Sequence, residues 1–281
     1  MTTEPISGDR LKELCRGWTP LGLAHFYEGV FKESGFKLPP HMWPVVLGLC
    51  DMRIKKLMLI CGPGSTKSQL LSVVYPAWLL GHDASMTVLE VSGGESLAQG
   101  FQSAVQEIIE YSPFWNEIFP NVRPDKNAGW SNDRGLFVTG RKPGIPDASY
   151  LAAGLQSRYI VGKHCKTMII DDPHDDSNSQ TLDQLEGVVR KFSNTLLGRA
   201  DPMGCRFIMA GRRWHQKDLY QELMNSEDWV VMVLPAERPG AEILYHDIHV
   251  PDDVDCIFTD KKVHCADGTI VDLRDSLRAP H

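Results

Sequence analysis

The chain has 281 residues, of which 42% are hydrophobic and 23% charged, as is typical of a soluble globular protein. It contains no run of the roughly 18 apolar residues that a membrane span needs, and no signal peptide, so we expect no membrane contact. A net charge of −7 excludes a surface uniformly suited to nucleic acid, so any DNA contact must be local. The seven scattered cysteines fit reduced thiols and a cytoplasmic protein.

Residues 1–50 carry apolar side chains at helical spacing and are expected to form a helical region that precedes the core. A polar or aromatic side chain just upstream of a phosphate-binding strand is a plausible adenine contact. His41 and Trp43 are therefore candidates for that role. The alternative for Trp43 is simple core packing.

The stretch 56–68 (KLMLICGPGSTKS) is typical of a buried strand that runs into a glycine-rich turn and then a helix over 69–80. In such a phosphate cradle, Lys67 neutralises phosphate charge and the Ser68 hydroxyl can bind Mg²⁺. Cys61 stands where the usual pattern has its first glycine, so a plain turn with a surface lysine remains the alternative. The expected nucleotide contacts are Gly62, Pro63, Gly64, Ser65, Thr66, Lys67, Ser68 and Gln69.

A second strand and helix are predicted at 86–91 and 96–111, where an apolar run precedes a segment of helical periodicity. Residues 112–135 are rich in Pro, Asn and Asp and indicate a loop. Short strands at 135–139 and 150–153 are expected to flank the parallel core.

The segment 166–173 (KTMIIDDP) reads as a Walker B strand that ends at two carboxylates. At the carboxyl edge of a parallel sheet, Asp171 would hold Mg²⁺ through its water shell and Asp172 would orient the attacking water. Two adjacent aspartates after a strand are also common in a turn or helix cap. The order of phosphate loop, second strand and acidic strand favours the nucleotide site.

A helix is predicted at 183–197, a strand at 206–210 and a last strand at 229–234. The sequence therefore predicts an α/β fold: a three-layer P-loop NTPase core of the ASCE type, at 51–235, with a mostly parallel sheet. An irregular lid or linker is expected at 236–281.

By these motifs the chain resembles the ATPase domain of the terminase large subunit, the motor that packages double-stranded DNA into viral capsids. The resemblance runs from about residue 38 to 235 and depends on the combination of motifs in order. Those motifs are STKSQ at 65–69, Asp171-Asp172-Pro173, SNTLLGR at 193–199, Arg213-Trp214-His215 and Asp218-Leu219.

The resemblance implies hydrolysis of ATP with Mg²⁺, coupled to translocation of double-stranded DNA by a ring of subunits on a portal protein. It also implies a terminase small subunit as partner and the host cell cytoplasm as location. By position, Lys67 and Ser68 would bind phosphate and Mg²⁺, while Asp171 supports the metal. Asp172 would take the catalytic carboxylate position, and Arg213 would belong to the motif that couples hydrolysis to movement.

Three departures from the family pattern bear on the site. Thr66 replaces the usual loop glycine, and Asp172 is one methylene shorter than the glutamate of many relatives. Where relatives often have Thr-Gly-Arg, this chain has Val161-Gly162-Lys163, so a trans-acting cation is either Lys163 or Arg158. The choice matters because lysine lacks the planar fork of arginine.

We expect neither nuclease activity nor a zinc site in this chain. Too few residues follow Pro235 to build the strands of a two-metal nuclease, although several are acidic. The acidic residues are Asp252, Asp253, Asp255, Asp260, Asp267, Asp272 and Asp275. The zinc-type residues, whose spacing matches no compact zinc pattern, are His246, His249, Cys256, His264 and Cys265.

Two other functions remain open from the sequence. One is another nucleic-acid-stimulated motor of the helicase group, which shares both phosphate motifs. The other is a nucleotide-binding scaffold without turnover, suggested by the missing loop glycine. The sequence is also expected to be a shortened form of a longer protein that carries a nuclease domain.

Overall fold

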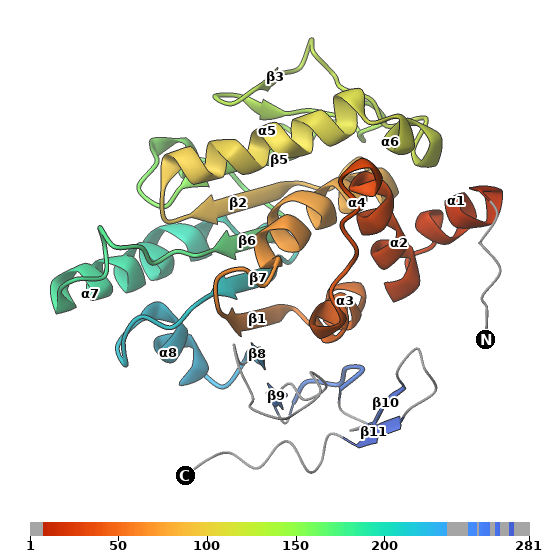
Figure 1. Cartoon of the computed structure of the whole chain (residues 1–281). Helices are drawn as coiled ribbons and strands as arrows, with labels where there is room; N and C mark the ends of the chain where they lie inside the picture. Colours follow the sequence, from red (N-terminus) through yellow and green to blue (C-terminus); the bar gives the residue numbers. More distant parts are fainter. Residues whose placement is uncertain (1–7, 235–246, 252, 259–261, 265–269, 273–281) are drawn as a thin grey trace.

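The computed structural model describes residues 8–234, 247–251, 253–258, 262–264 and 270–272 (Figure 1). In this part of the chain, a nine-stranded sheet has the order β3-β4-β5-β2-β6-β7-β1-β8-β9. Its strands are β1 (Lys56–Cys61), β2 (Val88–Ser92), β3 (Trp130–Ser131), β4 (Gly135–Leu136), β5 (Tyr150–Gly154), β6 (Thr167–Asp171), β7 (Arg206–Gly211), β8 (Val230–Leu234) and β9 (Asp247–His249). The six strands from β5 to β8 in this order pair in parallel, and the edge strands pair antiparallel.

Helices cover both faces of the sheet (Figure 1). The α-helices are α1 (Gly8–Arg16), α2 (Pro20–Val30), α3 (Trp43–Cys50), α4 (Tyr75–His82), α5 (Glu95–Tyr111), α6 (Pro113–Ile118), α7 (Leu182–Lys191) and α8 (Leu219–Met224). Short 3-10 turns are η1 (Lys32–Ser34), η2 (Pro40–Met42), η4 (Arg158–Ile160) and η6 (Leu197–Arg199), and π-helical turns are η3 (Gln69–Val74) and η5 (Phe192–Leu196). A separate antiparallel pair joins β10 (Lys262–His264) and β11 (Ile270–Asp272).

The core is split in two by the sheet, because successive side chains of a strand point to opposite faces. Leu57 and Leu59 of β1 pack into one hydrophobic cluster with α2, α3, α4 and α5, whereas Met58 between them packs into the other with α7 and α8. The predicted fold class is thus confirmed: helices flank a mostly parallel sheet. β7 lies between the phosphate-loop strand β1 and the acidic strand β6, which is the ASCE arrangement.

The N-terminal helices share a core with the sheet. The rings of Trp18 and Trp78 stack with centroids 4.4 Å apart, which joins the start of α2 to α4. The buried guanidinium of Arg206 in β7 donates to the carbonyl oxygens of Gly48 and Leu49 in α3, both at 2.7 Å. Within residues 8–50 the expected helices are present, and they pack on the sheet as part of the same body.

Three segments differ from the sequence prediction. The expected loop at 112–135 begins with α6, which Ser112 caps by accepting a hydrogen bond from the Trp115 N–H, while the Trp115 ring is buried. Helix α8 had no prediction. The sheet continues beyond residue 235, because β9 pairs antiparallel with β8, so the expected boundary of the core does not coincide with the edge of the sheet.

Two remaining expectations concern membranes and metals. None of the helices in the described residues has the length and apolarity needed to cross a bilayer. Within the same residues, no group of three or more His, Cys, Asp or Glu side chains is arranged to hold a metal ion. Of the tail residues considered for zinc, His246 and Cys265 lie outside the described part of the chain.

Candidate active site

The phosphate loop leaves β1 at Cys61 and turns through left-handed backbone. Gly64 has a φ of +77°, and Thr66 has a φ of +64°. A positive φ is uncommon for any residue but glycine, and for a β-branched side chain it is strained. Thr66 therefore adopts a left-handed conformation that glycine would adopt without cost.

Lys67 follows the turn and forms an ion pair with Asp172, with Nζ 2.7 Å from Oδ2. The lysine side chain is only 9% exposed and that of Asp172 29%. Burial alone would lower the pKa of Lys67, but the hydrogen bond with Asp172 and the charge of Asp171 hold it above its usual value. The structure thus brings the phosphate-binding lysine and the proposed catalytic carboxylate into direct contact.

Asp172 is held in an unusual backbone conformation, with a φ of +45°. Its N–H donates to the Ala210 carbonyl at 2.9 Å, and its own carbonyl accepts from the Gly93 N–H at 3.0 Å. A Cβ added to Gly211 would lie 2.7 Å from Asp172 Oδ1 and 1.8 Å from the Tyr220 hydroxyl. A glycine is therefore required at 211 for β7 to pass this close to the carboxylate.

Asp171 is fully buried at the end of β6. Burial raises its pKa to about 6, assisted by the neighbouring Asp172 and opposed by a hydrogen bond from Ser68 and the charge of Lys67. The Ser72 hydroxyl donates to Oδ2 at 3.2 Å, while Oδ1 has no hydrogen-bond partner among the described residues. A free carboxylate oxygen beside a serine hydroxyl is the hard oxygen set that Mg²⁺ prefers, so these residues fit the metal.

The two candidates for adenine contact are placed differently. His41 Nε2 lies 3.1 Å from the Ser65 carbonyl oxygen, so this side chain reaches the phosphate loop. Trp43 begins α3 and packs against the hydrophobic core. Gln69 accepts a hydrogen bond from the Tyr27 hydroxyl at 3.0 Å, which ties α2 to the start of η3.

Arg158 and Lys163 follow β5, at the carboxyl edge of the same sheet. Arg158 is exposed, with its guanidinium carbon 5.7 Å from the centroid of the Tyr159 ring, and Lys163 is half-buried. Among the described residues neither forms an ion pair, and neither is hydrogen-bonded to Lys67 or Asp172.

Arg213 has a structural environment that the sequence did not reveal. Its guanidinium pairs with the buried Asp218 at 3.0 Å and donates to Gln221 Oε1 at 3.0 Å and to the His215 carbonyl at 3.1 Å. Asp218 is the N-cap of α8, where it accepts from the Gln221 N–H. Arg213 therefore fixes the chain between β7 and α8.

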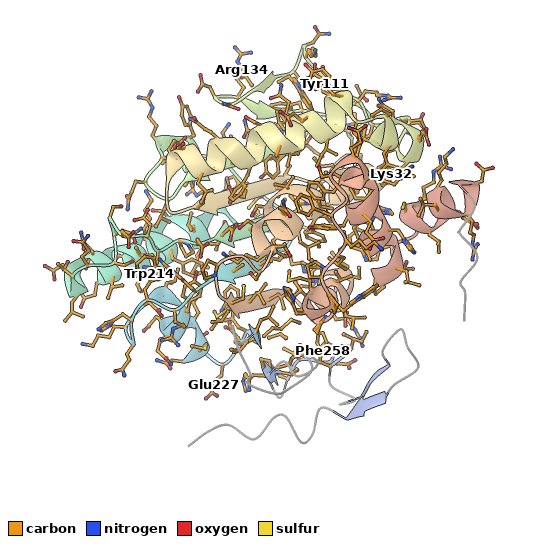
Figure 2. The ribbon with its side chains drawn as sticks, viewed as in Figure 1. Lys32, Tyr111, Arg134, Trp214, Glu227 and Phe258 are labelled. Carbon is orange, nitrogen blue, oxygen red and sulfur yellow. The ribbon has the colours of Figure 1, made fainter. Side chains whose placement is uncertain are left out.

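The neighbouring Arg212 is exposed, and its guanidinium carbon lies 4.1 Å from the centroid of the Trp214 ring. Trp214 lies beside α8, because its backbone N–H donates to Asp218 Oδ2 (Figure 2). Of these two consecutive arginines, Arg213 is paired with a carboxylate, whereas Arg212 stacks on an aromatic ring and has no ion pair among the described residues.

Sequence reasoning missed two buried polar residues near the site. His174 accepts a hydrogen bond from the Leu219 N–H at 2.9 Å and lies 3.1 Å from Ser179 Oγ, so it links the segment after Asp172 to α8. Glu90 is fully buried in β2, and burial raises its pKa well above the usual range. The only sequence signal for Glu90 was one charged residue inside an apolar strand.

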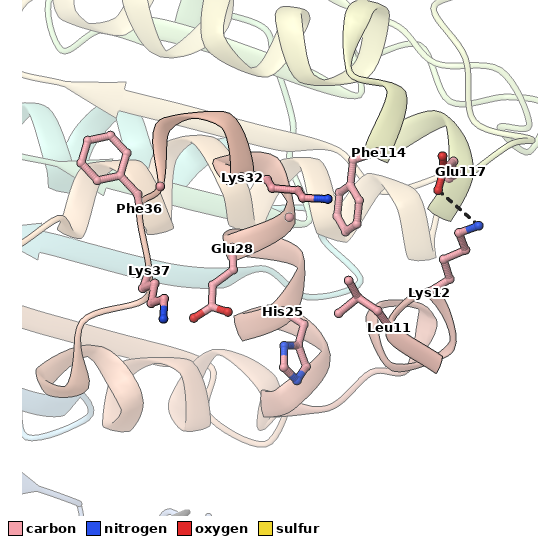
Figure 3. Close-up of a pocket in the computed structure, with 11 residues that line it drawn as sticks. Leu11, Lys12, His25, Glu28, Lys32, Phe36, Lys37, Phe114 and Glu117 are labelled. Carbon is pink, nitrogen blue, oxygen red and sulfur yellow. Dashed lines mark ion pairs between the residues drawn. The ribbon is translucent and has the colours of Figure 1, made fainter. Parts of the chain in front are cut away.

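A cavity of about 380 Å³ lies elsewhere, among side chains of α1, α2, η1 and α6 (Figure 3). Phe114 forms part of it by packing over Gly29, where an added Cβ would lie 2.1 Å from the ring. An ion pair between Lys12 and Glu117, at 3.3 Å, closes one side. None of its lining residues belongs to the phosphate loop or to the acidic strand.

No protein-family model and no curated protein sequence matches this chain. Among solved structures, the chain is similar to the yeast DEAD-box splicing factor Prp28, with a TM-score of 0.49 and 14% sequence identity. The match covers 77% of this chain and 50% of the other, so the chain spans about half the length of that structure.

Proposed function

We propose that this chain is the ATP-hydrolysing motor domain of a terminase large subunit, which drives double-stranded DNA into a viral procapsid. The observation that carries the ATPase part is the ion pair between Lys67 and Asp172, whose neighbours in the chain are Ser68 and the buried Asp171. A phosphate-binding lysine, a hydroxyl and two carboxylates converge at one sheet edge. This is the set of groups that phosphoryl transfer from ATP to water requires.

In the proposed mechanism, Lys67 exchanges Asp172 for the phosphate oxygens when ATP enters the loop. Asp172, released from that ion pair, then orients the attacking water and accepts its proton. Gly93, Ala210 and Gly211 keep the carboxylate at its position through this exchange. Bound Mg²⁺, held by Ser68 and by Asp171 through water, would neutralise charge that develops on the phosphates.

The packaging role is supported by the ordered motifs and by the position of the free cations. The exposed Arg158 and the half-buried Lys163 follow β5 at the carboxyl edge of the sheet, where either one would meet a neighbouring subunit's nucleotide. This fits a ring on a portal protein, with the terminase small subunit and double-stranded DNA as further partners. The proposed location is the host cell cytoplasm.

The test is steady-state ATP hydrolysis by wild type, Lys67→Ala and Asp172→Asn, each with and without double-stranded DNA and portal protein. Lys126→Ala is the matched control. This lysine is exposed and pairs with Glu110 of α5, which does not belong to the candidate site. Loss of turnover in both site variants but not in the control supports the ATPase. Stimulation of wild type by portal and DNA supports packaging; strand separation of a forked substrate would instead indicate a helicase.

A nucleotide-binding scaffold is the second candidate, favoured by the strained Thr66 in the loop. Tight Mg·ATP binding with no turnover, even with portal and DNA present, would establish it. Thr66→Gly would then show whether backbone strain is the reason, because glycine adopts the same φ freely.

A further inference from the structure

Three buried polar side chains lie in a row behind the proposed metal position. Glu90 and Ser92 belong to β2 and Asp171 to the adjacent β6, and none of the three is exposed to solvent. In the parallel register, Ser92 pairs with Asp171 and Glu90 pairs with Ile169. Because paired residues and residues two apart share a face, all three side chains point to the same side of the sheet, toward η3 and α5.

Four oxygen atoms of this row lack hydrogen-bond partners among the described residues. They are both carboxyl oxygens of Glu90, the hydroxyl of Ser92 and Oδ1 of Asp171. A buried polar group without a partner costs about 1–3 kcal/mol, so several in one place are rarely left unsatisfied. Each atom alone has many explanations, but their convergence from two neighbouring strands indicates a shared partner.

The residues of β5 that pair with the two β2 members of the row are small. The strand β5 places Ala152 opposite Glu90 and Gly154 opposite Ser92. The helical turn η3 contributes Ser72, whose hydroxyl already donates to Asp171, and the buried Tyr150 donates to the Ser72 carbonyl. A buried water needs two to four polar neighbours, and this row supplies them.

We propose that Glu90, Ser92 and Asp171 hold a buried water molecule, and that Glu90 acts through it as a positioning residue for Asp171. The water connects the carboxyl group of Glu90 to Asp171 Oδ1, while Ser72 holds Oδ2. Ser72 and the water then each occupy one lone-pair site of the Asp171 carboxylate and set its orientation, while its remaining lone-pair sites stay available to the proposed metal. Its role in metal binding rests on the proposed ATPase function, whereas the water site itself does not.

The test compares wild type with Glu90→Gln and Glu90→Leu. A high-resolution crystal structure of the nucleotide-free wild type should show a water within hydrogen-bond distance of Glu90 and Asp171, about 2.7–3.2 Å. Glu90→Gln should keep it, because the amide retains the shape and polarity of the carboxyl group. Glu90→Leu should lose it. A dry contact between these side chains, or a metal ion at this place, would overturn the proposal.

The second measurement is the Mg²⁺ concentration that half-saturates binding of a non-hydrolysable ATP analogue. Removing an outer residue that orients a metal-binding group typically weakens metal affinity 10- to 100-fold, so we expect about a 10-fold rise for Glu90→Leu and under about 2-fold for Glu90→Gln. Equal Mg²⁺ dependence in all three proteins would refute the positioning role. If Glu90→Leu does not fold, Ser92→Ala removes one water ligand and takes its place.

The two proposals fail separately. Absence of nucleotide binding by wild type would refute the ATPase and leave the water visible in the crystal structure. Normal ATP binding with no water in the row would refute the inference and leave the ATPase intact.

Discussion

The inner and outer parts of the candidate site are built differently. In the inner part, Lys67, Asp171 and Asp172 are largely buried and contact one another or a serine hydroxyl. In the outer part, Arg158 and Lys163 have no ion-pair partner among the described residues. The described residues thus bring a lysine, two carboxylates and a serine hydroxyl together. The two cations after β5 stay without an ion pair, and this is the difference that the proposed ring of subunits would use.

The largest expected effect concerns this outer part. Arg158→Ala should lower ATP turnover in assembled rings by about 1,000-fold, the lower range for a trans-acting arginine, while nucleotide affinity stays unchanged. The isolated domain should show no change, because there the cation has no neighbour to serve. Lys163→Ala is the comparison, since only one of the two cations is expected to matter. If both variants turn over ATP at the wild-type rate in rings, neither cation acts on a neighbouring subunit's nucleotide, and the proposed outer part of the site is wrong.

A smaller effect is expected in the inner part. Asp172→Asn removes the proton acceptor and should lower turnover by about 100-fold. It also removes the negative partner of Lys67, so the affinity for ATP should stay the same or rise. Binding of a fluorescent ATP analogue, measured beside turnover, separates the two effects. A loss of affinity equal to the loss of turnover would show that Asp172 holds the loop and has no part in the chemistry.

The two adjacent arginines allow a buried ion pair to be compared with an exposed stacking contact. Arg213→Ala leaves the buried Asp218 without its cation and should lower the free energy of unfolding by about 2 kcal/mol. Arg212→Ala removes an exposed side chain that stacks on Trp214 and should cost no more than about 0.5 kcal/mol. Urea unfolding of both variants gives the comparison. Equal losses would mean that the Asp218 pairing contributes little to stability.

The smallest effect concerns pH and lies in the helical region. His82 packs between aromatic rings, including those of Trp18 and Trp78, and burial lowers its pKa to about 4. Below pH 6.5 His82 is protonated in the unfolded chain, whereas in the folded chain it stays neutral down to about pH 4. Stability should therefore fall across that interval, by about 1 kcal/mol after allowance for partial exposure. Unfolding of His82→Gln, measured at pH 7 and pH 5, should lack this contribution.

The long apolar strands could be predicted from the sequence because burial on both faces leaves a continuous run, as in 57–60 and 167–170. The meeting of the phosphate loop with Asp171 and Asp172 followed from their positions at strand ends. The role of Arg213 could not be predicted, because its buried partner Asp218 is recognisable only once β7 and α8 are placed.

Other features escaped prediction for reasons of length and context. Helices α6 and α8 each have six residues, too few for a clear periodic pattern. Strand β9 has three residues and is recognisable only by its pairing with β8. Glu90 looked like an ordinary charged position because a strand with one polar residue usually turns it to solvent. The structure shows that η3 and α5 cover the face of β2 to which Glu90 points, so its side chain is fully buried.

Arg206 shows how the protein can and cannot be shortened. Its guanidinium, on a residue that is 3% exposed, donates to the carbonyl oxygens of Gly48, Leu49, Asp51 and Ile54. Carbonyl groups at the end of α3 and just after it therefore take the place of water around a buried charge in the sheet. A trimmed version that starts at residue 51 would strip away two of these four acceptors. A shortened chain therefore has to keep α3, and it has to keep α2 as well, because Leu23 and Phe26 share the hydrophobic core with the sheet.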